Sequence, residues 1–396
     1  MESQGYQGVE TGPIRPPSES KSLLIRVTRN CPWNKCRFCP VYKGQRFSRR
    51  PLEHVLRDID LVADWVDVLT NNSKGAKASQ SSAPNGDVTE SSLQQLRDSA
   101  AAQYSQDSLR ALPIAQHWVR AGAKSVFLQD ANALATNPAD LLKVLEHLGE
   151  RLPSVERITS YARSQTILKL SEEELRELRA AGLNRIHIGF ESGSDQVLEL
   201  MQKGATKAVH VEAGRRVRQA GIELSAYYMP GLGGRKFSVE NAIETADLVR
   251  QVVPDFLRLR TLAVPDRAPL ADDVRTGLFE KATDVENAQE LVLFLEQVGD
   301  VDCTIVSDHI LNLFEDLEGN LSQDREAMIH TLRRFLDLDP QEQRLYRIGR
   351  RCGVFRGVDD LTTPHLRAYA EQEYEQLGVT EYNIDQLVDE MVKRFI

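Results

Sequence analysis

The sequence predicts an α/β fold built on a parallel sheet, followed by a mainly helical region. Between residues 22 and 262, short apolar runs typical of strands alternate with longer stretches whose apolar residues recur at helical spacing. Beyond Pro265 this alternation stops and helical patterns predominate. Strands that alternate with helices at this spacing form parallel sheets with right-handed crossovers. We therefore expect one such sheet, with functional residues near the carboxyl ends of its strands.

The elements follow from local signals along the chain. Pro51 suits the first position of a helix, because its missing N–H would have no partner there, and Leu52, Val55 and Ile59 follow at helical spacing. The six predicted strands cover 22–28, 125–128, 156–160, 185–190, 222–228 and 256–262. The helices after them cover 51–66, 113–121, 138–152, 172–181, 206–220 and 239–252. The last region holds helical candidates at 283–298, 324–336 and 384–395 and a short strand at 302–306.

Composition divides the chain into three parts. Residues 1–20 are rich in Gly, Ser, Pro and Glu and predict a flexible tail. The core covers 21–265 and contains, at about 71–105, a polar stretch with little periodic apolar content, which predicts a solvated insertion. Residues 266–396 form the mainly helical accessory region.

Composition also limits the functional classes. No apolar run approaches the roughly 18 residues that a membrane helix needs, and the first 20 residues lack the apolar core of a secretory signal. The five cysteines are few, and three share one loop, as expected where thiols stay reduced. These features predict a cytoplasmic protein without a membrane partner. The net charge of −9 argues against broad nucleic-acid binding.

Three cysteines, Cys31, Cys36 and Cys39, lie in one loop after the first predicted strand. An iron–sulfur cluster normally has four Cys ligands, so a three-Cys site leaves one iron open to a ligand that is not protein. The spacing also opens the plant-type ferredoxin pattern, but the next cysteine is as far away as Cys303. Structural zinc would need a fourth donor, of which His54 is the nearest. A non-catalytic metal module, zinc-binding or a ferredoxin-like electron carrier, therefore remains the alternative to an enzyme.

With an aromatic residue, Phe38, before the last cysteine and motifs at later strand ends, the loop resembles that of the radical SAM superfamily. The resemblance covers about residues 20–265. It implies a partial (β/α)6 TIM-like barrel, a [4Fe-4S] cluster, and S-adenosyl-L-methionine (SAM) at the open iron, which the reduced cluster cleaves to a 5′-deoxyadenosyl radical. The commonest family spacing has three residues between the first two cysteines, whereas this chain has four.

The resemblance also suggests SAM-binding residues at strand ends. Glu191 and Ser192 match a motif that contacts the ribose or methionine part, although Glu191 would equally cap the following helix. Gln129 and Asp130 occupy the place of an element that receives the SAM ammonium, although Asp130 is also a common turn former. Arg163 is a candidate clamp for the SAM carboxylate, with a surface ion pair as the alternative.

A glycine-rich turn closes the fifth strand and contains Tyr228, Pro230 and Gly231. In the family this turn lies beside the adenine, and glycine allows backbone to approach a flat ligand closely. Arg258 and Arg260 alternate to one face of the sixth strand, where they would bind an anionic group.

Three residues are candidates for catalysis. His187 alternates to the same face as Glu191, although an inward histidine is often only a hydrogen-bonded core residue. His309 lies one helical turn before Asn312 if that stretch is helical; a capped helix start is the plainer interpretation. Cys352 lies among arginines, which would lower its pKa, whereas Cys303 fits a small buried apolar residue.

Charge clusters suggest partners. The basic cysteine loop, including Lys35, Arg37 and Arg50, would dock an acidic flavodoxin or ferredoxin-type electron donor, or only compensate the charge of the cluster and SAM. An arginine-rich run over 333–356 would bind phosphate or carboxylate, or form a solvated helical face. Since the chain ends in acidic helices, we expect a small-molecule or peptide substrate that is anionic, with nucleic acid unlikely and a radical SAM enzyme acting on RNA as the alternative.

Overall fold

The computed structural model describes residues 5–76 and 104–394, with side chains described up to residue 70 in the first range. Most of the predicted insertion, residues 77–103, lies outside the described residues, whereas its first residues continue a helix to Ala76. The chain forms two compact units. Unit 1 comprises Met1–Pro32, Gln45–Ala162 and Leu170–Ile186, and unit 2 comprises Trp33–Gly44, Arg163–Lys169 and His187–Ile396.

Eight strands belong to one mostly parallel sheet, in the order β1-β4-β5-β6-β7-β8-β9-β10. Their apolar residues are buried almost continuously, as expected for strands with helices packed on them. A small antiparallel pair, β2 with β3, flanks the cysteine loop. The strands are β1 Leu23–Arg26, β2 Thr28–Arg29, β3 Ser48–Arg49, β4 Ser125–Gln129, β5 Arg157–Ala162, β6 Leu183–Glu191, β7 Glu223–Tyr228, β8 Phe256–Leu259, β9 Thr304–Val306 and β10 Gly319–Asn320.

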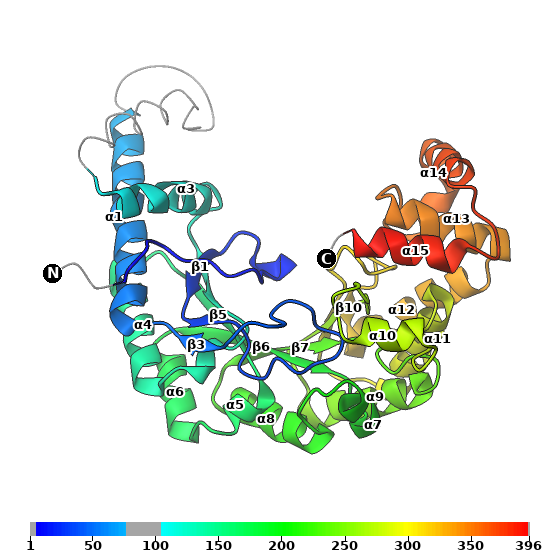
Figure 1. Ribbon diagram of the computed structural model, residues 1–396, viewed down its shortest axis with the longest axis horizontal. Coiled ribbons are helices and arrows are strands. Elements are labelled where there is room, and N and C mark those ends of the chain that lie inside the picture. Colours follow the sequence, from blue (N-terminus) through cyan, green and yellow to red (C-terminus); the bar gives the residue numbers. More distant parts are fainter. Residues whose placement is uncertain (1–4, 77–103, 395–396) are drawn as a thin grey trace. The chain divides into compact units, whose positions relative to one another are not determined.

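Unit 1 contains β1, β4 and β5, which pair in parallel, and helices that begin at clear caps. The Asn137 side chain accepts a hydrogen bond from the Ala139 N–H, and Ser171 forms a reciprocal capping box with Glu174. The helix α1 packs against α3 and α4 (Figure 1). These helices are α1 Leu52–Ala76, α3 Gln106–Arg120, α4 Pro138–Arg151 and α6 Glu172–Ala180.

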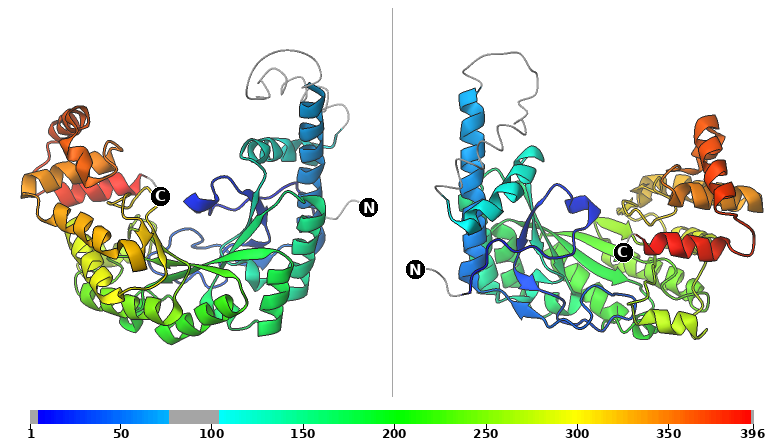
Figure 2. Two further views of the ribbon diagram at one scale, coloured as in Figure 1. Left: turned by 180° about the vertical axis from the view of Figure 1, so that it is seen from behind. Right: turned by 45° about the horizontal axis from the view of Figure 1, so that its top comes forward.

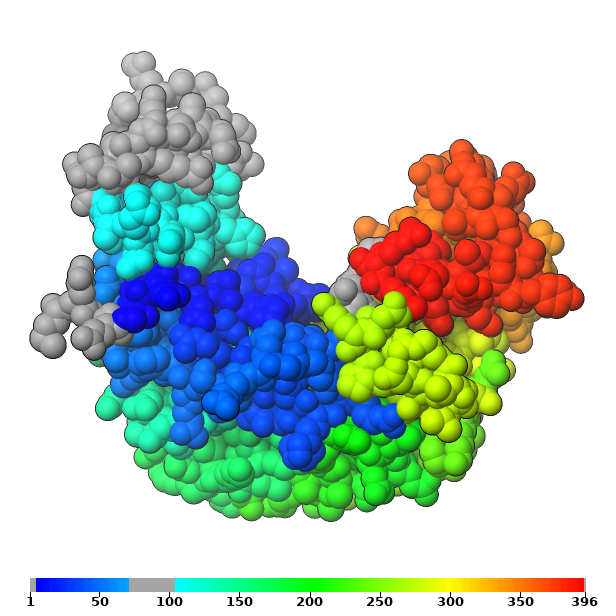
Figure 3. All heavy atoms as spheres, viewed as in Figure 1, coloured from blue at the N-terminus to red at the C-terminus, as the bar shows by residue number. Residues whose placement is uncertain are grey.

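Residues 5–20, expected to be part of a flexible tail, instead make specific contacts within unit 1. The Tyr6 hydroxyl donates to Asp58 of α1 at 2.7 Å, and Arg110 of α3 donates to the Gln7 carbonyl at 2.7 Å. Figure 3 shows this segment in dark blue on the surface. Glu10 forms ion pairs with Arg26, Arg29 and Arg50. The expectation missed them because the partners are distant in sequence.

Unit 2 contains β7, β8 and β9, which also pair in parallel, with β10 antiparallel at the edge. The predicted strand at 302–306 is present as β9 and extends the sheet beside β8. Helix α11 packs against α9 and α12, and α13 packs against α14 and α15 (Figure 2). The helices are α5 Ser164–Ile167, α7 Asp195–Leu200, α8 Lys207–Gln219, α9 Ser238–Val252, α10 Leu270–Arg275, α11 Asp284–Val298, α12 Leu321–Leu336, α13 Pro340–Arg351, α14 Pro364–Gln376 and α15 Ile384–Lys393.

The predicted fold class is confirmed. Strands and helices alternate through the first six strands of the sheet, as in a partial (β/α)6 barrel, and a mainly helical region follows. None of the helices in the described ranges is both long and apolar enough to cross a membrane.

Candidate cofactor and substrate site

The three loop cysteines are partly exposed, and no disulfide joins any of the five cysteines. Cys31 belongs to unit 1, whereas Cys36 and Cys39 belong to unit 2. Among residues 5–70 and 104–394, no group of three His, Cys, Asp or Glu side chains is gathered closely enough for one metal ion. The fit of the loop to a cluster therefore rests on its donor chemistry, since accessible thiols outside disulfides ionise to the thiolates that iron–sulfur clusters take.

The unit 2 part of the loop is fixed by backbone contacts to α7 and α10. The Arg37 N–H donates to the Met201 carbonyl at 3.0 Å, and the Leu270 N–H donates to the Arg37 carbonyl at 2.9 Å. The Trp33 indole donates to the Gln202 carbonyl at 2.7 Å. Cys36 and Cys39 are thus on a segment held on both sides, although it contains no helix or strand.

Glu191 ends β6 and forms an ion pair with Lys203, Nζ to Oε1 at 3.0 Å. Burial lowers the pKa of Lys203, but the negative charges of Glu191 and Cys36 outweigh burial and raise it overall. Gly189 makes room for the pair, because a Cβ there would lie 2.2 Å from the Glu191 carboxylate. Lys203 was missed by sequence reasoning, since a lysine in a turn carries no signal of burial.

Glu191 does not cap the next helix. Ser194 caps α7 by accepting from the Val197 N–H, so the structural alternative for Glu191 does not hold. Ser192 is buried, and its hydroxyl accepts from the Ser194 N–H at 2.9 Å. Arg163 donates to the Lys203 carbonyl at 2.9 Å and lies over the Trp33 ring at 4.9 Å. The structure thus brings Arg163, Glu191 and the unit 2 part of the cysteine loop together around Lys203.

The turn after β7 is held by Glu290 of α11. The Glu290 carboxylate accepts from the Tyr228 hydroxyl at 2.9 Å and from the Gly231 N–H at 3.1 Å. It also accepts from Ser238 at 2.6 Å and Asn241 at 2.7 Å. Burial raises the pKa of Glu290, although these donors oppose the shift. Sequence reasoning missed Glu290. The pattern that could have revealed its burial is its position one turn before Phe294, on the apolar face of the predicted helix.

Gly231 is required where this turn approaches α11. Its φ of 78° lies in the left-handed region. A Cβ at this position would also lie 2.3 Å from the Asn287 side-chain oxygen. The predicted Tyr228, Pro230 and Gly231 therefore form one rigid turn at a strand end.

Residues 102–249 match the family described as the Radical SAM superfamily. This range contains the Glu191 motif and the turn after β7, and the three-cysteine loop precedes it. This match identifies a radical SAM domain within the chain. Enzymes of this superfamily use a [4Fe-4S] cluster and SAM, the two cofactors that the three-cysteine loop also predicts.

Proteins similar to this chain have several different activities. The chain is 20% identical over 129 residues to a tRNA uridine(34) acetyltransferase of Methanocaldococcus infernus, which covers 32% of this chain and 24% of that protein. The Elp3 structure from Methanocaldococcus infernus has a TM-score of 0.40 at 16% identity, covering 49% of this chain and 50% of that one. The radical SAM methyltransferase TsrM of Kitasatospora setae, with cobalamin and a [4Fe-4S] cluster bound, has a TM-score of 0.41 at 15% identity, covering 65% and 37%. The chain spans half or less of the length of each.

Gln129 and Asp130 lie in unit 1 and contact its N-terminal segment. The Gln129 side chain accepts from the Gly12 N–H at 2.8 Å, and Asp130 pairs with Arg26 at 2.6 Å. Asp130 is 1% exposed. A SAM ammonium would therefore have to replace a guanidinium at this carboxylate, and the predicted role of Asp130 stays a prediction.

The three catalytic candidates lie in different surroundings within unit 2. His187 is buried beside Tyr227, with ring centroids 5.6 Å apart. His309 lies in a turn after β9, so the expected helix over 309–312 is wrong. Cys352 follows the last residue of α13 and lies near Glu373. Burial, together with the negative charge of Glu373, raises the pKa of the Cys352 thiol. The expected lowering is thus corrected. Cys303 is 1% exposed and fits the buried apolar role.

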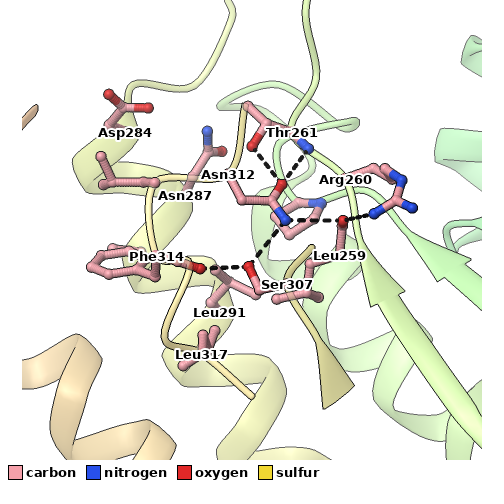
Figure 4. A pocket seen from close by; sticks show the side chains of 13 residues that line it. Leu259, Arg260, Thr261, Asp284, Asn287, Leu291, Ser307, Asn312, Phe314 and Leu317 are labelled. Carbon is pink, nitrogen blue, oxygen red and sulfur yellow. Dashed lines mark hydrogen bonds between the residues drawn. The ribbon is translucent and has the colours of Figure 1, made fainter. Parts of the chain in front are cut away.

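Asn312 and Ser307 fasten the turn that carries His309 (Figure 4). The Asn312 side chain accepts from the Thr261 N–H at 3.1 Å and donates to the Leu259 carbonyl at 3.1 Å. A cavity of about 30 Å³ beside them has room for water.

The arginine run does not form the expected anion-binding patch. Arg347 and Arg351 are buried and share Asp284, and Arg350 pairs with Glu315. The exposed Arg333 pairs with Glu296 at 2.6 Å. In the cysteine loop, Arg50 is likewise buried and pairs with Asp58, so it cannot dock a partner. Sequence reasoning missed these ion pairs because acidic partners such as Asp284 are far from the arginines in sequence.

Proposed function

We propose that Cys31, Cys36 and Cys39 hold the [4Fe-4S] cluster of this radical SAM enzyme. The loop spacing together with the family match over residues 102–249 carries this assignment. Held by these residues, the cluster would supply the electron for reductive cleavage of SAM to a 5′-deoxyadenosyl radical. The SAM-binding residues proposed here are Gln129, Asp130, Arg163, Glu191, Ser192, Tyr228, Pro230 and Gly231.

The residues of unit 2 support this proposal through what they can hold in place. The rigid turn at Gly231 offers a backbone surface for a flat group. The Glu191–Lys203 pair places one carboxylate and one ammonium near the cysteine loop, where they would orient the polar parts of SAM by charge-assisted hydrogen bonds. A flavodoxin or ferredoxin-type donor would dock near the exposed Lys35.

Anaerobic reconstitution with iron and sulfide tests the cluster assignment. We expect about four irons per chain and an electron paramagnetic resonance spectrum that changes when SAM is added. Replacing all three loop cysteines with Ala should abolish iron binding, whereas the control Cys352→Ala should retain it. Stoichiometric zinc, or a two-iron cluster that does not respond to SAM, would support the non-catalytic metal module instead.

The substrate proposed is a small molecule or peptide with an anionic group, and not RNA. The exposed acidic residues of α14, such as Glu371, would repel a phosphate backbone, and the arginine run is engaged in ion pairs. Titration with total tRNA at near-physiological salt tests this choice. Saturable submicromolar binding would favour an RNA substrate, for which the tRNA relative is the precedent.

A further inference from the structure

Polar side chains line one face of β7 and β8 up to their carboxyl ends. Arg258 and Arg260 alternate to the face opposite Leu257 and Leu259, which are buried. The Arg258 guanidinium donates to Ser225 of β7 at 3.0 Å. The Arg260 guanidinium lies over the Tyr227 ring at 4.6 Å. All of these residues belong to unit 2, so their mutual geometry is fixed within one compact unit.

Both guanidiniums converge on one carboxylate. Asp308, two residues beyond β9, accepts from Arg258 at 2.5 Å and from Arg260 at 2.9 Å. Exposure rises toward the strand ends: the Arg258 side chain is 5% exposed, Arg260 12% and Asp308 21%. The arrangement is therefore accessible from the carboxyl ends of the strands, where ligands bind in open α/β sheets.

His309 adds a neutral donor beside this pair. Its Nδ1 accepts from the Leu311 N–H at 3.3 Å, so in the neutral ring the proton lies on Nε2. Burial, reinforced by Arg260, lowers the pKa of His309 to about 4, which keeps the ring neutral at physiological pH. An N–H donor thus follows Asp308 directly in the chain.

We propose that Arg260 and His309 bind a carboxylate group of the substrate, which competes with Asp308 for the Arg260 guanidinium. This inference rests on the proposed function and names the anionic group that the enzyme recognises. Asp308 is itself a carboxylate held between these two guanidiniums, so their spacing already suits a planar, two-oxygen anion. His309 follows Asp308 directly in the chain and would add a neutral N–H donor without adding charge.

The experiment measures the affinity of the reconstituted full chain for succinate by calorimetry, at constant ionic strength. Arg260→Gln should weaken the dissociation constant about tenfold, because a charge-assisted contact is lost. Asp308→Asn should instead tighten it about threefold, because a competing negative charge is removed. His309→Asn, which keeps an acceptor for the Leu311 N–H but loses the Nε2 donor, should weaken it about threefold.

Two exposed ion-pair variants, Arg333→Gln and Asp300→Asn, are matched controls and should leave the affinity unchanged. The neutral analogue succinamide should not bind. Unchanged affinity in both Arg260→Gln and His309→Asn, or weaker binding in Asp308→Asn, would overturn the proposal in favour of a purely structural ion triad. Inorganic phosphate binding more tightly than succinate, with the same dependence on the variants, would overturn the assignment to carboxylate.

Failure of the proposed function would be seen separately. Iron content and the spectral response to SAM are measured on the same preparations. Normal cluster properties without succinate binding would refute only the carboxylate site. Absent cluster binding would refute the proposed function without bearing on the carboxylate site, because Arg260 and His309 are not among the residues assigned to the cluster.

Discussion

Two aspartates of unit 2 have the same kind of partners in different surroundings. Asp284, in the first turn of α11, lies between Arg347 and Arg351, and all three side chains are at most 7% exposed. Asp308 lies between Arg258 and Arg260 at the strand ends and is 21% exposed. The buried Asp284 pairs hold α11 and α13 together. The partly exposed Asp308 pairs are open to solvent, so a ligand carboxylate could take the place of Asp308. Chemistry alone does not distinguish the two roles.

The largest expected effect is at Asp284. Asp284→Asn should lower the free energy of unfolding by about 4 kcal/mol, because it removes the carboxylate paired with the buried Arg351 and leaves Arg347 with only Asp385. Asp308→Asn should lower it by no more than about 2 kcal/mol, since water reaches that site. Urea unfolding of both variants makes the measurement. Equal losses would break the distinction.

Acid titration gives an independent measure of the same aspartate. The Asp284 pKa is lowered to about 2; burial alone would raise it, but Arg351 and Arg347 outweigh burial. As pH falls, Asp284 is therefore protonated in the unfolded chain before it is protonated in the folded chain. Its contribution to the free energy of unfolding is complete above about pH 4 and is lost as pH falls toward 2. We expect the free energy of unfolding, measured by urea unfolding at several pH values, to fall less steeply between about pH 4 and 2 in Asp284→Asn than in the wild type.

Glu290 sharpens the comparison, because neutral donors surround it instead of cations. Glu290→Ala should cost about 3 kcal/mol, since Tyr228, Gly231 and Asn241 lose a buried acceptor. Glu290→Gln should cost about half as much, because one oxygen remains. Urea unfolding provides the free energies, and a loss below about 0.5 kcal/mol in Glu290→Ala would show that water replaces the carboxylate.

His309 should make stability depend on pH at the exposed end of the strands. Its pKa falls from 6.5 to about 4 on folding, so the stabilisation is complete above about pH 6.5 and is lost as pH falls toward 4. The expected loss is about 2 kcal/mol after allowing for partial exposure. His309→Asn should remove this dependence, whereas the exposed control His365→Asn should keep it.

The smallest effect is expected at the surface of the helical region. Arg333 and Glu296 are 57% and 38% exposed, so Arg333→Gln should change the free energy of unfolding by less than about 0.5 kcal/mol. A larger loss would show that exposure does not separate structural from exchangeable ion pairs. Urea unfolding beside Asp284→Asn makes the contrast direct.

The sequence predicted what local patterns encode. The six principal strands were predicted because buried parallel strands are continuous apolar runs, and the α9 region because its apolar residues recur at helical spacing. Helix α14 was missed, since Ala370 is the residue it buries and Tyr369 stays exposed. The arginine run was misinterpreted because its partners, such as Asp284, lie far away in sequence.

The candidate site divides in the same way. The cysteine loop and the turn at Gly231 are contiguous in sequence, so their spacing could be recognised. The Lys203 contact with Glu191 and the Glu290 contact with Tyr228 each join separate elements, and no local pattern encodes them. The pairing of Asp308 with Arg258 and Arg260 likewise required the register of β8 and β9.

The backbone of Glu191 has a φ of 66°, in the left-handed region that glycine and asparagine adopt more easily. A glutamate there costs about 1 kcal/mol of backbone strain, which its ion pair with Lys203 offsets. Over evolutionary time the two positions should therefore vary together. Where a related chain has lost the lysine, drift should replace the glutamate with glycine or asparagine, so the residue paired with position 203 would mark which descendants still use this carboxylate.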